Sequence, residues 1–205
     1  ESFIGFESSN DLTTEAGPDL LNEDGTPAAR SLIISAPTTE LTAAERATVA
    51  EFADAGGAVI LLGSAADQDA VSNFEPVLTE LNANVSFTDE AVTDETNSLT
   101  DDPAVFTTGN VSDAYADLFT PFTAENTTPT QPSDLGPVVL DSVSSLLDAN
   151  GEPLTDDSVV AVSAESTATN SDTDGNGDAV SYPADTDIPV VAVDGSVVGV
   201  TGPFV

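Results

Sequence analysis

One short stretch of the sequence has the residue types and spacing of a metal-binding loop. In residues 172–178 (DTDGNGD), oxygen-bearing side chains alternate and a glycine occupies the sixth position. This pattern matches the first half of an EF-hand calcium loop, in which carboxylate and amide oxygens surround a hard cation. The twelfth position is Pro183 instead of a bidentate glutamate. We predict a calcium site whose ligands are Asp172, Asp174, Asn176, Asp178 and Asp185, the last supplying the missing carboxylate, with Asp187 as another source. The alternative is an acidic surface loop without a ligand.

A second set of polar residues follows two apolar runs, 32–35 and 58–62, that we expect to be parallel strands. Ligands of open parallel sheets bind beyond the carboxyl ends of the strands. The candidate ligand-binding residues at these positions are Ser35, Thr38, Gly63, Ser64 and Asp67. The alternative is that all five form turns and helix caps, a role for which Asp67 is well suited as an N-cap.

Missing residue types restrict the catalytic chemistry. The chain has no His, no Cys and no Lys, which excludes Ser-His-Asp and Cys-His arrangements, His-ligated zinc and Schiff-base catalysis. Neither a P-loop nor a dinucleotide-binding glycine motif is present. A pair of carboxylates of the glycosidase kind remains available, but 37 acidic residues offer no pair that stands out. We therefore predict that the chain is not an enzyme, with a carboxylate-dependent hydrolase as an alternative.

Three Asn-X-Ser/Thr sequons are candidate glycosylation sites, and they begin at Asn84, Asn110 and Asn126. A chain rich in Asn and Thr also produces such triplets by chance. The sequons are therefore compatible with an exported protein without requiring one.

The charge of the chain indicates its environment. Thirty-seven acidic residues and two basic ones, Arg30 and Arg46, give a formal net charge of −35. In dilute buffer this charge opposes compaction, whereas molar salt shortens the Debye length to about 3 Å. A lysine-free acidic composition is typical of proteins from extreme halophiles, and 40% apolar residues argue against a disordered chain. The lack of basic residues argues against binding to nucleic acid or anionic membranes, and no apolar run is long enough to span a bilayer.

The clearest structural unit is a βαβ crossover between residues 32 and 62. Thr42 and Glu45 form a capping box at the start of the expected helix, and Gly56-Gly57 ends it. The next strand begins at Ala58. Two strands joined in this way are expected to be parallel, with a right-handed crossover.

Further elements are expected along the rest of the chain. A helix over 68–81 contains Pro76, which should kink or divide it, and an aromatic cluster (Tyr115, Phe119, Phe122) is expected to close the core. The expected strands are 85–87, 103–107, 138–140, 158–163, 189–193 and 197–201, and the last two form a hairpin at Asp194-Gly195. Residues 88–102 are expected to be a loop, and 123–136 a surface connection.

The βαβ unit resembles a known superfamily. The segments LIISAP (32–37), LTAAE (41–45) and FADAGGAVILLG (52–63), with PVVAV (189–193) and GSVVGVTG (195–202), are similar to the class I glutamine-amidotransferase-like superfamily. They are most similar to its non-catalytic branch, which is related to gliding-transport and intraflagellar-transport domains. The resemblance implies a flavodoxin-like fold and a binding or scaffolding role. The catalytic branch needs a Cys and a His, so no catalytic residue carries over.

These observations predict one α/β domain over residues 1–205, either a whole protein or one module of a longer one. The expected fold has three layers, with a mostly parallel sheet, flanking helices and a C-terminal β-hairpin. The expected function is a non-catalytic binding or assembly domain, extracellular or on the cell surface, in a high-salt environment. Its partners would be other copies of itself, forming a homo-oligomer, or neighbouring surface proteins. No cofactor is expected beyond calcium or other bridging cations. The alternative is a solute-binding accessory domain of a membrane transport system.

Overall fold

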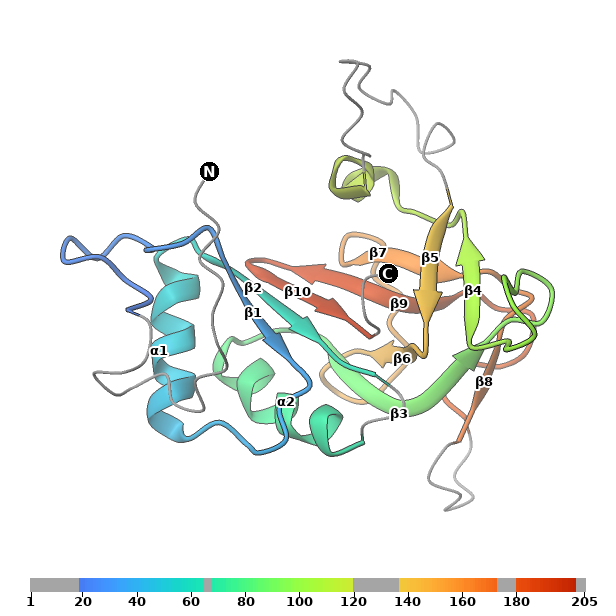
Figure 1. The fold of residues 1–205 in the computed structure, drawn as a ribbon, viewed down its shortest axis with the longest axis horizontal. Helices are drawn as coiled ribbons and strands as arrows, with labels where there is room; N and C mark the ends of the chain where they lie inside the picture. Colours follow the sequence, from blue (N-terminus) through green and yellow to red (C-terminus); the bar gives the residue numbers. More distant parts are fainter. Residues whose placement is uncertain (1–18, 65–67, 120–136, 173–179, 202–205) are drawn as a thin grey trace.

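The computed structural model describes residues 19–64, 68–119, 137–172 and 180–201. The elements in chain order are β1 (Ser31–Ser35), α1 (Ala43–Asp54), β2 (Ala58–Leu62), α2 (Gln68–Glu80), β3 (Ser86–Thr93), β4 (Val105–Thr108), the 3-10 helix η1 (Asp113–Phe119), β5 (Val138–Asp141), β6 (Ser144–Leu147), β7 (Val160–Ala164), β8 (Thr169–Ser171), β9 (Ile188–Asp194) and β10 (Val197–Val200) (Figure 1). No helix among the described residues is long and apolar enough to cross a membrane.

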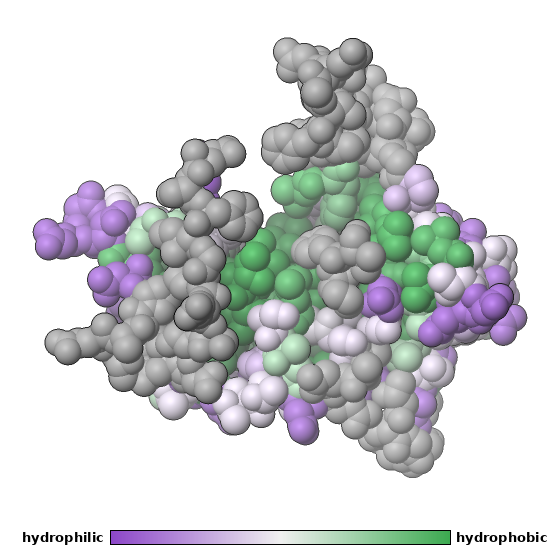
Figure 2. Space-filling model, in the orientation of Figure 1, coloured by the Kyte–Doolittle hydropathy of each residue, from purple (hydrophilic) through white to green (hydrophobic). Residues whose placement is uncertain are grey.

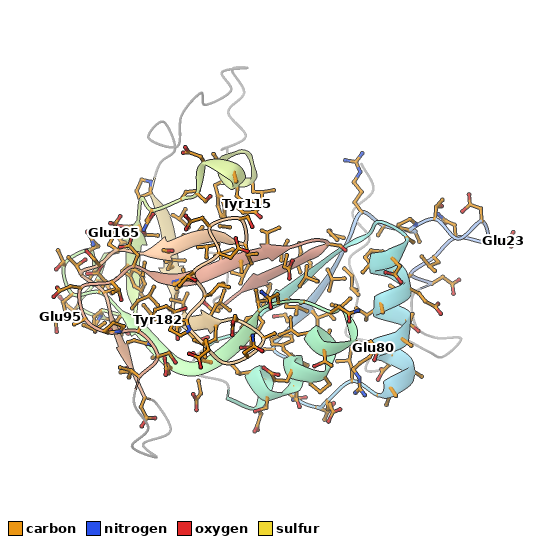
Figure 3. All side chains as sticks on the ribbon, turned by 180° about the vertical axis from the view of Figure 1, so that it is seen from behind. Glu23, Glu80, Glu95, Tyr115, Glu165 and Tyr182 are labelled. Carbon is orange, nitrogen blue, oxygen red and sulfur yellow. The ribbon has the colours of Figure 1, made fainter. Side chains whose placement is uncertain are left out.

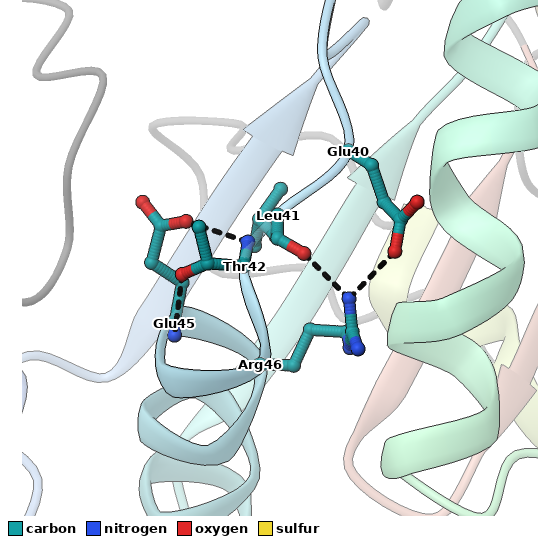
Figure 4. Close-up of polar contacts among 5 residues, drawn as sticks. All are labelled: Glu40, Leu41, Thr42, Glu45 and Arg46. Atoms are coloured by element: carbon teal, nitrogen blue, oxygen red, sulfur yellow. Dashed lines mark hydrogen bonds and ion pairs between the residues drawn. The ribbon is translucent and has the colours of Figure 1, made fainter.

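The predicted βαβ crossover is confirmed. The Thr42 hydroxyl accepts the backbone N–H of Glu45, and the Glu45 carboxylate accepts the backbone N–H of Thr42 at 2.7 Å (Figure 4). This reciprocal pair satisfies two donors that the first turn of a helix leaves free. At the other end Gly56 has φ of 96°, a conformation that favours glycine, and β2 follows at Ala58.

The largest sheet has five strands in the order β1-β2-β10-β9-β7. β1 and β10 both run parallel to β2, whereas β9 runs antiparallel to β10 and to β7. The predicted hairpin is confirmed, because Gly195 with φ of 60° turns β9 into β10. The last of the described strands in the chain therefore occupies the middle of the sheet, between β2 and β9 (Figure 1).

The expected three-layer, mostly parallel flavodoxin-like architecture is wrong. Of the four pairings in the large sheet two are antiparallel, and two further sheets, β6-β3-β8 and β4-β5, are entirely antiparallel. The described residues contain only two α-helices. After α2 the chain does not return to the large sheet with a third parallel strand; it enters β3 of the smaller sheet instead. The segments that form β6 and β8 are too short to contain the apolar runs from which strands are usually predicted.

Both helices pack on one face of the five-stranded sheet. Val49 and Phe52 of α1 and Phe74 of α2 share a buried cluster with Val59 and Leu61 of β2. Since side chains alternate along a strand, the neighbours of Val59 and Leu61 in β2 point to the opposite face. A second buried cluster joins β3, β4, β5, β7, β9 and β10, and Leu62 of β2 and Val198 of β10 pack against it.

The later elements agree only in part with expectation. α2 runs through Pro76 as one helix to Glu80, so this proline does not divide it. Tyr115 and Phe119 of η1 pack against the second cluster, as expected of a patch that closes the core. Phe122 and the connection over 123–136 lie outside the described residues.

Candidate functional site

The expected ligand site lies where β1 and β2 end. Ser35 is paired with Leu62 in the parallel register, so Ser35 and Ser64 follow neighbouring strands at the same edge of the sheet. Ser35 and Thr38 are exposed. The structure thus brings these residues to one edge, as the parallel pairing predicted. Asp67 lies outside the described residues.

Two of these residues have structural contacts of their own. The Ser64 hydroxyl donates to the carbonyl of Ser142 at 3.1 Å. Gly63 is buried, and a Cβ there would lie 3.3 Å from the ring of Phe87, so a side chain would press on the core. Nearby, the Asn73 amide of α2 donates to the carbonyl of Pro37 at 2.8 Å and ties down the segment after β1. Ser64 and Gly63 thus have structural contacts, and ligand binding by this set of residues stays a prediction.

The predicted calcium loop is largely outside the described residues. Asp174, Asn176 and Asp178 are not described, whereas Asp172 directly follows β8 and Asp185 has φ of 63° before β9. Within residues 19–64, 68–119, 137–172 and 180–201, no three His, Cys, Asp or Glu side chains are grouped closely enough to hold a metal ion. Calcium binding stays a prediction.

The sequon asparagines differ in their surroundings. Asn84 is exposed between α2 and β3, and its backbone N–H donates to the Asp194 carboxylate at 2.6 Å. The side-chain amide of Asn110 is half-buried and donates to the Asp187 carboxylate at 2.9 Å. A glycan on Asn110 would change this bond, so Asn84 is the better-placed acceptor of the two. Asn126 lies outside the described residues.

Sequence analysis missed a cleft between α2 and β3. It has a volume of about 510 Å³, and its lining mixes apolar residues such as Phe87 and Leu147 with the acidic residues Glu75, Asp89 and Glu90. Neither Ser35 nor Ser64 lines it. The solute-binding alternative therefore gains no support from this cleft at the position where the sequence placed it.

Glu90 is the centre of a hydrogen-bond network beside this cleft. One carboxylate oxygen accepts the backbone N–H and the hydroxyl of Ser181, both at 2.9 Å. The other accepts the Ser145 hydroxyl at 3.1 Å and the Asn170 amide. These bonds join β3, β6, β8 and the segment before β9, so Glu90 serves to hold strands together. One glutamate among 37 acidic residues gives no sequence signal for such a role.

Tyr182 fills the space behind the network and is 6% exposed. Its hydroxyl donates to the Leu146 carbonyl at 2.5 Å and accepts the Leu154 N–H at 2.8 Å. Burial, with smaller contributions from the charges of Glu90 and Asp148, raises the pKa of Tyr182 to about 12. The side chain therefore stays neutral as a structural bridge between β6 and the loop after it (Figure 3).

The surface feature best suited to binding is the face of the large sheet opposite the helices. We call the part of this face near β1 and β2 the open face and define it by Ile33, Ile60, Leu62 and Val198, of which Leu62 and Val198 also pack against the second buried cluster. The parallel registers place Ile33 beside Ile60, and Ile60 beside Val198. Ile60, Leu62 and Val198 are half-buried, and Ile33 at the edge is 56% exposed. Figure 2 shows hydrophobic surface gathered over the middle of this sheet.

The open face differs from the rest of the surface in charge. The acidic side chains Glu23 and Glu95 lie at opposite ends of the molecule in Figure 3. The strands β1 and β2 contain no charged residue. One cation, Arg46, pairs with Glu40 at 2.8 Å on the helix side (Figure 4). Arg30, just before β1, is exposed and has no ion pair among the described residues.

Comparison with known proteins supports the fold alone. No protein-family model matches the chain, and no curated protein matches it in sequence. Among solved structures, it is similar to one described as "mmIFT52 N-terminal domain", with a TM-score of 0.58 and 14% identity. The similarity covers 91% of this chain and 71% of that one. The resemblance to an intraflagellar-transport domain thus has a distant structural counterpart, at an identity that shows the fold only.

Proposed function

We propose that the chain is a non-catalytic binding or assembly domain that joins other copies of itself or neighbouring proteins in a high-salt environment. The observation that carries this proposal is the open face. Apolar side chains grouped on one accessible surface are typical of protein–protein contact sites. Exposed Ile33 lies beside half-buried Ile60, and Ile60 lies beside half-buried Val198. Their strands carry no carboxylate that a partner would have to desolvate.

Electrostatics supports the high-salt part of the proposal. Two bodies of net charge −35 repel each other strongly in dilute buffer. Molar salt screens this repulsion within about 3 Å and leaves apolar burial as the main attraction. An association through the open face is therefore expected to strengthen as salt rises, which is the reverse of a contact held by ion pairs.

The structural similarity to the IFT52 N-terminal domain supports the fold alone, so the case against catalysis rests on the residue types of this chain. The chain lacks the Cys and His on which the amidotransferase-like catalytic branch depends. A location outside the cell or on its surface belongs to the same proposal.

The test is size exclusion with light scattering in about 3 M salt, repeated in low salt, with calcium and with a chelator. We expect association that grows with salt and with protein concentration. A calcium requirement would add the 172–178 loop to the assembly mechanism. A chain that remains monomeric under all four conditions, and binds no neighbouring surface protein in high salt, would overturn the proposal.

A further inference from the structure

The outer edge of β1 has backbone groups that no described residue pairs. The Ala58 N–H donates to the Arg30 carbonyl, and the Ala36 N–H donates to the Leu62 carbonyl. Residues 30 and 36 thus direct their backbone groups toward β2. Since this direction alternates along a strand, residues 32 and 34 do the same, while Ser31, Ile33 and Ser35 direct theirs away from the sheet.

The opposite edge of the same sheet is covered. The Ser112 N–H donates to the Ala161 carbonyl of β7, and the Ser163 N–H of β7 donates to the Asn110 carbonyl. Val111 forms an isolated bridge with Val162. Proteins usually protect such edges with charge, proline, bulges or covering segments. Among the described residues β1 has none of these protections, and no acidic residue occurs between Asp24 and Glu40.

The sequence of β1, Ser-Leu-Ile-Ile-Ser, is close to a palindrome about Ile33. In an antiparallel pair of two β1 strands centred there, Ile33 faces Ile33, Leu32 faces Ile34, and Ser31 faces Ser35. The outward-directed residues 31, 33 and 35 then lie opposite one another, as hydrogen-bonded pairs of an antiparallel ladder require. A two-fold axis through this pair relates the two copies, so each copy uses the same surface for the contact.

We propose that the partner at the open face is a second copy of this chain, joined edge to edge through antiparallel β1 strands centred on Ile33. This inference rests on the proposed assembly function and specifies its partner and register. The pairing extends the five-stranded sheet across the dimer and places the two Ile33 side chains together on the open face. The carboxylate-free stretch around β1 is where two highly acidic copies approach with least repulsion.

The chain contains no cysteine, so a single introduced thiol reports on this contact. In the proposed register the Cα atoms at position 33 are about 5.5 Å apart, within the range of about 4.4–6.8 Å that a disulfide spans. Ile33→Cys should therefore form a covalent dimer on mild oxidation in molar salt. Leu99→Cys is the matched control, because Leu99 is also 56% exposed but lies away from β1, and it should stay monomeric.

A second pair of variants tests the same contact without oxidation. Ile33→Lys should weaken self-association at least about tenfold, because it places two ammonium groups opposite each other at the axis. Leu99→Lys makes the same change in net charge at an equally exposed site and should leave association unchanged. Circular dichroism of all four variants checks that they fold.

The outcomes separate the two proposals. If the chain self-associates but Ile33→Cys fails to cross-link and Ile33→Lys associates normally, the β1 register is refuted while assembly stands. If the wild-type chain never associates, and the thiol of Ile33→Cys resists labelling, the edge is covered by the chain itself and the inference fails. Selective cross-linking at position 33, lost in low salt, would establish the edge-to-edge dimer.

Discussion

Replacing Tyr182 by phenylalanine removes one oxygen atom from a buried junction. The hydroxyl at this position receives the Leu154 N–H and donates to the Leu146 carbonyl. Both leucines are buried, so neither backbone group has solvent beside it to replace the lost partner. The ring itself still fills its space, and the substitution therefore isolates the two hydrogen bonds.

The expected cost follows from leaving two buried polar groups unpaired. Each unpaired group costs about 1–3 kcal/mol. The total is smaller than the sum, because the variant has no hydroxyl that must lose its hydration when the chain folds. We expect a loss of about 2–4 kcal/mol from a total stability of roughly 5–15 kcal/mol. For a chain of this length, the melting temperature should then fall by roughly 4–16 °C.

Thermal unfolding followed by circular dichroism in molar salt measures this effect. Tyr115→Phe is the matched control, because Tyr115 is the only other tyrosine and its hydroxyl contacts the carbonyls of Ser158 and Val193 in a more open setting. The control should cost about 0.5–1.5 kcal/mol. Equal losses for the two variants would refute the reasoning that Tyr182 bridges two buried backbone groups.

Four shorter predictions follow from the same contacts. Absorbance titration should show a tyrosine that ionises near pH 12 and is absent from Tyr182→Phe. Because folding raises the pKa of Tyr182, its contribution to the unfolding free energy should be lost as pH rises from about 10 to 12. A single tyrosine transition near pH 10 would contradict this prediction. Burial raises the pKa of Asp94, but hydrogen bonds lower it, and the net result is a pKa below 3.8. Asp94→Asn should therefore reduce the unfolding free energy by about 1.5–3 kcal/mol at neutral pH, and the difference from wild type should disappear as pH falls below about 4. A cost that does not change with pH would contradict this prediction. Gly57→Ala should destabilise the fold by about 1–3 kcal/mol in denaturant titrations, because the new Cβ would lie 2.3 Å from the Phe52 ring. Gly109→Ala should cost less, because the atom nearest to its Cβ would lie 3.9 Å away. Equal costs for the two variants would contradict this prediction. The unfolding free energy of the wild-type chain should rise from low to molar salt, and a flat dependence would contradict the role of screening.

The sequence predicted elements whose signals are local. The capping box at Thr42, the glycine stop at Gly56 and the turn at Gly195 are each determined by a few adjacent residues, and all three are where they were expected. The apolar runs of β1 and β2 predicted their parallel pairing for the same reason.

What failed depends on contacts between distant residues. β3 continues to Thr93 through residues expected to be a loop, because Thr88 and Glu90 find buried partners on β6 and β8. β6 (SSLL) and β8 (TNS) are too short to be recognised as strands from sequence, and both pair with β3, which lies between them. The open face was likewise hidden in the sequence, since an apolar run indicates a strand but not which of its two faces stays uncovered.

The position of β10 has a consequence for synthesis on the ribosome. Val59 in β2 has its second strand partner at Val197, far along the chain. At a translation rate of about 5–20 residues per second, β2 waits on the order of 10 s for that partner. During this time both edges of the apolar pair β1-β2 are exposed in the nascent βαβ unit. Rapid folding of this unit alone does not cover these edges. Crowded polysomes are therefore where this protein is most vulnerable to misassembly, and the acidic segments between β2 and β10 can keep neighbouring nascent chains apart by mutual repulsion.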